Sequence, residues 1–338
     1  MRRKQHFWRF PVVCALCAAL ILPVAAQARE LIPMGQAVGI QMTTQGMLVA
    51  GLADVETPQG TVSPARDAGF CAGDVICAID GRKIETSDDF LTALAQAGEQ
   101  LTVTVLRGGA ETALTVTPAV TADGAVQLGL WLRDGVSGVG TVTYCDPATG
   151  AYGALGHGIT DEDSGVLMPL RTGSIMRAEI ADTKRGEAGA PGELIGSFDP
   201  GQTIGDISGN CVFGIFGTMA ETPEGTPVET ASDDAVKTGP AVVRSTVAGD
   251  TAVDYAVEIS RIYRENGCTR YLLTVTDPAL LEATGGIVQG MSGSPILQDG
   301  KLIGAVTHVL LNDPTKGYGL SIDSMLRAAE QQTTEAAA

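Results

Sequence analysis

The sequence predicts a mostly β protein built from two units, a small α+β unit followed by a larger all-β unit. Of the 338 residues 43 are glycine, and only 4% are aromatic. Short runs rich in Val, Thr, Ile and Ala alternate with turn residues, a pattern typical of antiparallel sheets. Without its N-terminal segment the chain keeps about 310 residues, which is enough for two domains.

Residues 1–28 have the pattern of a signal peptide. Arg2, Arg3 and Lys4 lead into an apolar run over 10–26, and Ala26-Gln27-Ala28 offers the small residues of an export cleavage site. We therefore expect an exported, extracytoplasmic protein that is cleaved after Ala28. The apolar run of 17 residues is at the lower limit for crossing a bilayer, so an uncleaved N-terminal anchor is the alternative.

The charge of the mature chain excludes some classes of function. Residues 1–28 contain four basic residues and no acidic residue, so their removal takes the formal charge from −17 to −21. Such a surface repels nucleic acid and anionic lipid. Only two histidines and five scattered cysteines remain, without a Cys-x-x-Cys pair, so we expect no metal ion or other cofactor. The cysteines are expected to be small buried apolar residues, and one disulfide stays open.

Residues 36–120 form the small unit. We expect strands at 38–42, 46–51, 75–79, 101–107 and 114–118, a tight turn at Asp80-Gly81, and a helix over 88–96 that Ser87 caps. Through Pro64-Ala65, Ala68-Gly69 and 73–81 the unit resembles a bacterial PDZ domain. The resemblance implies that the loop at Gly39-Ile40 holds the carboxy terminus of a peptide ligand, with Ile40 and Met42 beside an apolar pocket. The alternative is a PDZ domain that only braces its neighbour.

The stretch Gly290-Met291-Ser292-Gly293 is the strongest candidate for chemistry in the second unit, residues 121–330. Flanking glycines permit a tight turn that exposes the serine hydroxyl, and the amides of Gly290 and Ser292 can converge on an oxyanion. A hairpin is expected directly after it, from Pro295 to 306. The alternative is a glycine-rich hairpin entry with an incidental serine. Ser164 and Ser294 are weaker candidates, because their glycines are less well placed.

A serine nucleophile needs a base, and the mature chain offers His157 and His308. His157 lies between two glycines at the end of an expected strand, where a substrate can approach. His308 lies in a mostly apolar strand and is expected to be a sheet or core residue, so His157 is preferred as the base. The loops at 171–196 and 220–237 are candidates for shaping the substrate pocket.

Asp277 is the preferred acid for orienting the histidine, since Pro278 holds it in an extended conformation at a strand end. The alternative role for Asp277 is to cap a short helix over 279–283. The rival acids are Asp161, Asp163, Asp199 and Asp206.

The order His157, Asp277, Ser292 resembles the chymotrypsin-like serine proteases with a double β-barrel. A resemblance that covers nearly the whole mature chain is to the stage IV sporulation protein B peptidases, which join an N-terminal PDZ domain to a serine peptidase domain. The segments that carry it are 154–159, 191–193, 210–217, 276–278, 284–295, 304–309 and 312–319. Position by position, it implies that His157 is the catalytic histidine, Ser292 the nucleophile and Asp277 the acid. The acid lies only 15 residues before the serine, later than in chymotrypsin-like enzymes.

The resemblance also implies a biological role. Such peptidases act in the space between the spore membranes, cut the extracytoplasmic part of a membrane-bound regulator, and so release an intramembrane protease that activates a late sporulation sigma factor. They tend to process themselves, here in the region before the PDZ unit. Two alternatives are a non-enzymatic PDZ adaptor and a quality-control serine protease, although the latter usually carries its PDZ domain after the protease.

Overall fold

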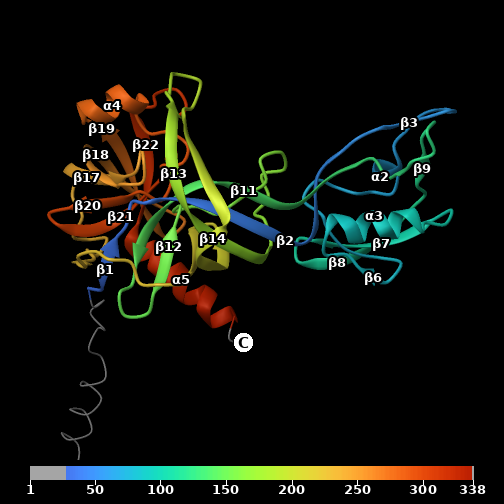
Figure 1. Cartoon of the computed structure of the whole chain (residues 1–338), viewed down its shortest axis with the longest axis horizontal. Helices are drawn as coiled ribbons and strands as arrows, with labels where there is room; N and C mark the ends of the chain where they lie inside the picture. The colour runs from blue at the N-terminus through green and yellow to red at the C-terminus, as the bar shows by residue number, and fades with distance from the viewer. Residues whose placement is uncertain (1–27, 337–338) are drawn as a thin grey trace, which may run out of the picture.

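A computed structural model describes residues 28–336 and has two lobes (Figure 1). The smaller lobe is the PDZ unit, and the larger lobe holds two β-barrels. Two long strands, β2 (Ala37–Leu52) and β11 (Leu130–Cys145), run between the lobes and pair with each other antiparallel over most of their length. The predicted mostly β fold is confirmed.

The PDZ unit packs two helices against short strands, close to the elements that the sequence predicts. Its core gathers Phe70, Ile76, Phe90 and Leu101. The Asp80-Gly81 turn forms between β5 and β6, with both residues at positive φ. Besides the second half of β2, its elements are β3 (Val55–Thr57), β4 (Gly60–Val62), α2 (Pro64–Asp67), β5 (Val75–Ile79), β6 (Arg82–Lys83), α3 (Ser87–Ala95), β7 (Leu101–Arg107), β8 (Ala110–Val116), β9 (Ala119–Val120) and β10 (Val126–Gln127).

Helix α3 begins one residue earlier than predicted. Thr86, not Ser87, is its N-cap, and it forms a capping box in which Thr86 Oγ1 accepts from Asp89 N–H while the Asp89 carboxylate accepts from Thr86 N–H. This leaves the Ser87 hydroxyl free to bond elsewhere, and it donates to Asp134 Oδ2 at the start of β11.

The N-terminal barrel is a ring of six strands. From β2 the order runs through β13, β14, β15, β12 and β11, and the β11–β2 pairing closes the ring. Its remaining strands are β12 (Ala151–Ala154), β13 (Leu170–Lys184), β14 (Glu193–Cys211) and β15 (Gly214–Met219), and β1 (Glu30–Pro33) and β16 (Val228–Glu229) extend the sheet beyond β11.

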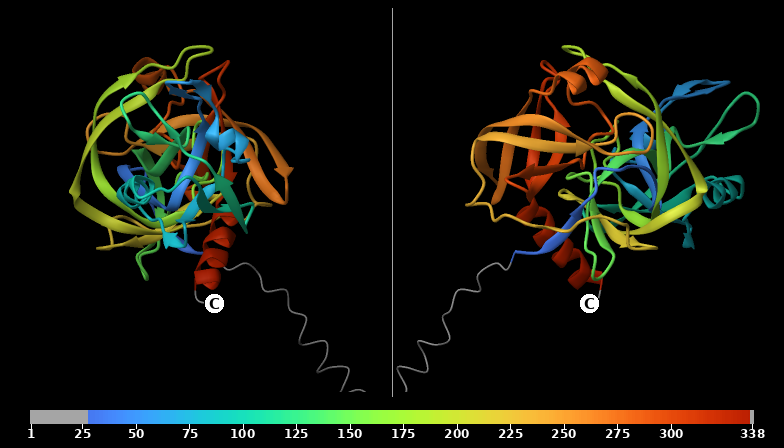
Figure 2. Two further views of the ribbon diagram at one scale, coloured as in Figure 1. Left: turned by 90° about the vertical axis from the view of Figure 1, so that its right-hand side faces the viewer. Right: turned by 60° about the vertical axis from the view of Figure 1, so that its left-hand side comes forward.

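The C-terminal barrel is a second closed ring, in the order β17-β18-β19-β22-β21-β20. The two rings together are the predicted double β-barrel. The C-terminal helix contacts β21, β22 and β14 and extends from the barrels toward the C-terminus in both views of Figure 2. The elements are β17 (Gly239–Ser245), β18 (Val253–Glu265), β19 (Cys268–Val275), α4 (Pro278–Thr284), β20 (Pro295–Gln298), β21 (Lys301–Val309), β22 (Lys316–Ser321) and α5 (Ile322–Ala336).

The predicted peptide site at Gly39, Ile40 and Met42 is wrong. These residues lie in the first half of β2, where the strand is paired on one edge with β11 and on the other with β13. Ile40 and Met42 are buried in the N-terminal barrel, and the Gly39 backbone packs against the ring of Phe198. Because both edges of the strand are used, no peptide can add there. The first half of β2 therefore belongs to the N-terminal barrel, whereas Met47 and Leu48 in its second half pair with β5 of the PDZ unit.

The predicted signal peptide lies outside the described residues, except for Ala28. Within residues 28–336 no helix is both long and apolar enough to cross a membrane. Cys145 and Cys268 are buried free thiols, as the sequence predicts, whereas Cys71 is an exposed one.

Candidate active site

The two barrels bring the loop after β12 and the turn before β20 together against β21. The first carries His157 and the second carries Ser292. A Cβ atom added to Gly156 would lie 3.0 Å from Thr307 Cγ2, and one added to Gly293 would lie 2.4 Å from Leu155 N. Glycine at both positions thus allows the two loops and the strand to pack in direct contact.

Hydrogen bonds to β11 and β21 fix the Ser292 turn. Thr141 N–H donates to the Ser292 carbonyl at 3.0 Å, and Thr141 Oγ1 donates to the Gly290 carbonyl at 2.7 Å. On the other side Gly293 N–H donates to the Val306 carbonyl at 2.7 Å. Gly290 and Gly293 both have positive φ, +95° and +96°, which favours glycine.

The two amides predicted to form an oxyanion hole are not used by the fold. Each neighbouring amide in the turn has a backbone acceptor: Met291 N–H donates to Val288 and Ser294 N–H to Met291. The N–H groups of Gly290 and Ser292 donate to no acceptor within residues 28–336. They are therefore available to a negatively charged oxygen, as acyl transfer requires.

A backbone carbonyl of its own loop fixes the tautomer of the His157 ring. Its Nδ1 lies 2.9 Å from the Gly158 carbonyl, and because a carbonyl only accepts hydrogen bonds, Nδ1 must carry the proton. Nε2 is then the unprotonated nitrogen. Burial lowers the pKa of His157 below its ordinary value, which keeps the ring neutral at neutral pH.

Ser292 and His157 contact two consecutive residues of β21, Thr307 and His308. The Ser292 hydroxyl donates to the Thr307 carbonyl at 2.6 Å. The ring of His157 lies against the ring of the next residue, His308, with the centroids 4.6 Å apart. Within residues 28–336 the Ser292 hydroxyl forms no hydrogen bond with His157.

His308 has a different position from the one the sequence predicts. It is exposed at the end of the strand, and its ring packs against that of His157 at a tilt of 34° instead of joining the core. Partial desolvation of its ring, and then the neighbouring His157, lower the pKa of His308 to about 4. The strand changes from buried to exposed positions after Thr307. The apolar residues on both sides of His308 gave no sign of this change in the sequence.

Asn210 is a second residue whose part was missed. Its Oδ1 accepts from Ile159 N–H at 2.8 Å, and its Nδ2 donates to the carbonyls of Ile159 and Met168. One side chain on β14 thereby holds both ends of the loop that follows His157. A lone asparagine in the sequence gave no signal of this long-range role.

The structure does not bring Asp277 to His157. Asp277 is the N-cap of α4, where Oδ1 accepts from the N–H groups of Ala279 and Leu280, and Oδ2 accepts from Ala256 N–H. These backbone bonds, that of Ala256 first, lower the pKa of Asp277. Within residues 28–336 no carboxylate forms a hydrogen bond or ion pair with His157. The capping role, which the sequence left as the alternative, is the one that the contacts show.

The rival candidates also have other partners. Asp161 is buried, accepts from Ser164 N–H and Oγ, and forms an ion pair with Arg133. Buried Ser294 donates to the Ser245 hydroxyl. These contacts hold loops and barrel strands in place.

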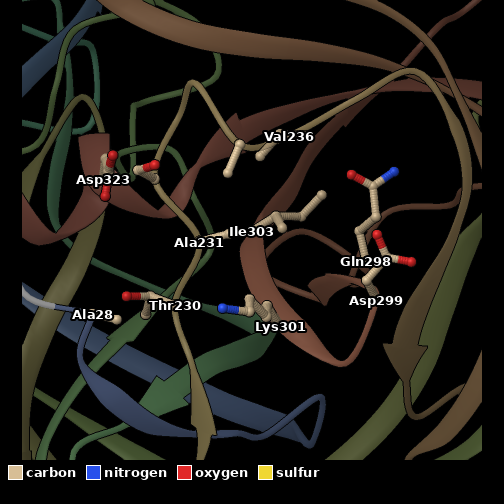
Figure 3. A pocket seen from close by; sticks show the side chains of 11 residues that line it. Ala28, Thr230, Ala231, Val236, Gln298, Asp299, Lys301, Ile303 and Asp323 are labelled. Atoms are coloured by element: carbon tan, nitrogen blue, oxygen red, sulfur yellow. The ribbon is translucent and has the colours of Figure 1, made fainter.

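A pocket of about 520 Å³ opens beside the Gly290–Gly293 turn. Gly290 and Gln289 form one wall, and Val139, Leu194 and Phe198 give it apolar surface, while Glu162 and Glu193 add two carboxylates. Residues 193–196 belong to the predicted specificity loop at 171–196, which the structure resolves as the hairpin of β13 and β14. A second pocket, of about 330 Å³, lies at Ala28, Thr230, Lys301 and Asp323 (Figure 3) and contains none of the candidate catalytic residues.

Comparison with known families decides the class of the protein. The family model of the SpoIVB peptidase S55 family matches residues 124–326, which is more than half of the chain. The chain belongs to the SpoIVB peptidase S55 family. A PDZ domain model matches residues 38–117. This S55 peptidase is therefore a serine peptidase with a PDZ domain, and protein or peptide binding follows from both parts.

Two further comparisons were made, with solved structures and with curated proteins. Among solved structures, the S55 peptidase is similar to the active form of the Rv3671c protease from M. tuberculosis, with 14% sequence identity and a TM-score of 0.35 over 58% of this chain and 74% of the other. No curated protein matches the sequence.

Proposed function

We propose that this S55 peptidase is an exported serine endopeptidase in which Ser292 is the nucleophile and His157 the general base. One observation carries the proposal. In the Gly290–Gly293 turn, two amides have no acceptor in the described chain. The Ser292 hydroxyl of the same turn donates to Thr307, the residue before His308, whose ring packs against that of His157. This arrangement supplies a nucleophile, a base and an oxyanion hole within one small region.

The proposed reaction is acyl transfer to water. His157 Nε2 removes the Ser292 proton as Oγ attacks the peptide carbonyl, and the amides of Gly290 and Ser292 bind the oxyanion. The resulting imidazolium donates its proton to the leaving amine, and water then releases the acyl group by the same steps in reverse roles. The Gly158 carbonyl holds the Nδ1 proton throughout and so orients the ring.

The proposed substrate is the extracytoplasmic part of a membrane-bound regulator, whose cleavage releases an intramembrane protease and activates a late sporulation sigma factor. Family membership and the export signal that the sequence predicts in residues 1–28 support this role and a location between the spore membranes. The PDZ unit placed before the peptidase supports signalling over general quality control, by analogy of domain order.

Self-processing is proposed for the segment before the PDZ unit. The described chain starts at the surface, where Arg29 N–H donates to Thr230 Oγ1 and β1 begins at Glu30. Cleavage before β1 would leave its pairing with β11 and β16 intact.

Mass spectrometry of the N-termini of purified parent and Ser292→Ala protein tests the proposal. We expect the parent to accumulate an N-terminus that the variant lacks, because removal of the nucleophile stops peptide hydrolysis. Identical N-termini in the two proteins would contradict self-cleavage. Unchanged biological activity of Ser292→Ala would favour the non-enzymatic PDZ adaptor instead.

A further inference from the structure

We propose that the PDZ unit positions His157, because it packs against the loop that follows this residue. Residues 159–168 of that loop form a hairpin between β12 and β13, here called the histidine hairpin. This positioning role rests on the proposed function, in which His157 is the base. It assigns Val75 of β5 and Met168 of the hairpin as positioning residues.

The histidine hairpin begins two residues after His157. Met168 N–H donates to the Ile159 carbonyl at 3.0 Å and closes the base of the hairpin. Only Gly158 separates this base from His157, and the Gly158 carbonyl is the group that lies 2.9 Å from His157 Nδ1. A shift of the hairpin base would therefore disturb the hydrogen bond that orients the ring.

Apolar side chains connect the hairpin base to the PDZ unit. Met168 is almost completely buried, and it belongs to the same apolar cluster as Val75 of β5. Ile159, on the other side of the hairpin base, and Leu106 of β7 pack against this cluster. Protein interiors leave few voids, so removing atoms from a PDZ side chain in the cluster should loosen the hairpin base.

The tip of the histidine hairpin also lies against the PDZ unit. Gly73 precedes β5, and a Cβ atom added to it would lie 2.9 Å from Val166 Cγ2. Arg133 of β11 forms ion pairs with Asp161 and Asp163 in the same tip. The hairpin is thus held at its base and at its tip by different contacts.

A polar contact also joins the two lobes beside the hairpin. Arg171, near the start of β13, forms an ion pair with Glu85 of the PDZ unit at 3.2 Å. Both side chains are partly exposed, and ion pairs in contact with water stabilise little. The buried cluster that contains Val75 and Met168 therefore contributes most of the connection.

Movement of the hairpin should be visible in the titration of His157. Burial lowers the pKa of its ring, and the titratable group that packs against it within the described chain is His308. A looser hairpin lets water hydrate the imidazolium, so the pKa of His157 should rise toward its ordinary value of about 6.5. A change that only lowers the stability of the PDZ unit should leave this pKa unchanged.

Val75→Ala in the full-length protein tests the positioning role. The change removes the branched end of the side chain from the shared cluster and leaves the sequence of both catalytic loops intact. We expect a fluorophosphonate to label Ser292 about tenfold more slowly than in the parent, since a misplacement of about 1 Å can cost about 100-fold in rate. The midpoint of the acid limb of its pH profile should lie at higher pH than that of the parent.

Val103→Ala is the matched control, because it removes the same atoms from a different apolar cluster of the PDZ unit. Val103 is a buried residue of β7 in the core that contains Phe70 and Phe90. Its loss of unfolding free energy in denaturant should be similar to that of Val75→Ala, whereas its labelling rate and pH profile should match those of the parent. Equal slowing in the two variants would overturn the positioning role, since the stability of the lobe would then explain it.

Met168 allows a rescue test from the other side of the contact. Met168→Ala should slow labelling as Val75→Ala does, whereas Met168→Leu, which nearly keeps the volume, should label close to the parent's rate. Labelling of Met168→Ala at the parent's rate would overturn the positioning role.

Amide hydrogen exchange at residues 159–168 measures the contact without catalysis. Exchange there should be faster in Val75→Ala than in Val103→Ala. Equal exchange in the two variants would also overturn the positioning role. Faster exchange in Val75→Ala, together with a parent that never labels, would refute the peptidase function and leave the packing of the hairpin on the PDZ unit intact.

Discussion

At the scale of single residues, the proposed base, His157, is oriented by neutral groups. The Gly158 carbonyl holds Nδ1 of His157, and the ring of His308 covers one face. A carboxylate in that place would stabilise the imidazolium and raise the histidine pKa. Here burial dominates instead and lowers the pKa of both histidines.

The acid limb of the pH profile should reflect this arrangement. As the proposed base, His157 must be neutral, so its lowered pKa means that activity should persist through neutral pH and fall only below the ordinary histidine value of about 6.5. The rate of probe labelling at Ser292, followed from about pH 4 to about pH 9, measures it. A midpoint above the ordinary value would indicate a carboxylate partner and contradict the structure.

Substitutions of Asp277 distinguish its role as a helix cap from a role in catalysis. Asparagine keeps one acceptor for the N-cap bonds but places a donor NH2 opposite Ala256 N–H, so Asp277→Asn and Asp277→Ala should each lose about 1 kcal/mol of unfolding free energy, and both should still label. Denaturant unfolding and probe labelling are the two readouts. If Asp277→Asn abolished labelling as His157→Ala does, the acid would belong to the catalytic machinery after all.

At the scale of elements, local signals predicted those parts of the fold that depend on neighbouring residues. The Asp80-Gly81 turn, helix α3 and the hairpin after Pro295 follow from turn chemistry and periodicity. The pairing partners of β2 could not be predicted this way. Residues 37–52 form one strand shared between two lobes, and only the positions of β11 and β13 decide that its first half has no free edge.

The hairpin of β13 and β14 leads to a prediction about specificity. Glu193 on β14 and Glu162 in the loop after His157 are exposed carboxylates in the pocket beside Gly290. Peptides with Lys or Arg placed in this pocket should be cleaved a few-fold faster than their Gln counterparts, and added salt should reduce the difference.

The double variant Glu162→Gln, Glu193→Gln should remove this preference, as judged by kcat/KM for paired peptides. Glu258→Gln, an exposed change on β18 away from the pocket, is the control and should leave the preference intact. The same preference in the double variant and the parent would show that the carboxylates do not contact the substrate.

At the scale of the whole molecule, the two barrels create the site by joining loops that are far apart in the chain. Residue type and glycine context were enough to select His157 and Ser292 as candidates. The contact of His308 with His157, the bonds of Asn210 to the loop after His157, and the length of β11 depend on packing between distant segments, such as Gly156 against Thr307. No local sequence pattern encodes such packing. For Asp277 the local pattern was ambiguous, since an aspartate before a proline suits a helix cap as well as a catalytic acid, and the structure shows the cap.

The most direct test of the His157–Ser292 pair is covalent labelling by a fluorophosphonate, with the modified residue located by mass spectrometry. The parent should be labelled at Ser292 alone, and both Ser292→Ala and His157→Ala should remain unlabelled while folding normally by circular dichroism. Equal labelling of the parent and Ser292→Ala, or a parent that takes up no probe, would contradict the proposed catalytic pair.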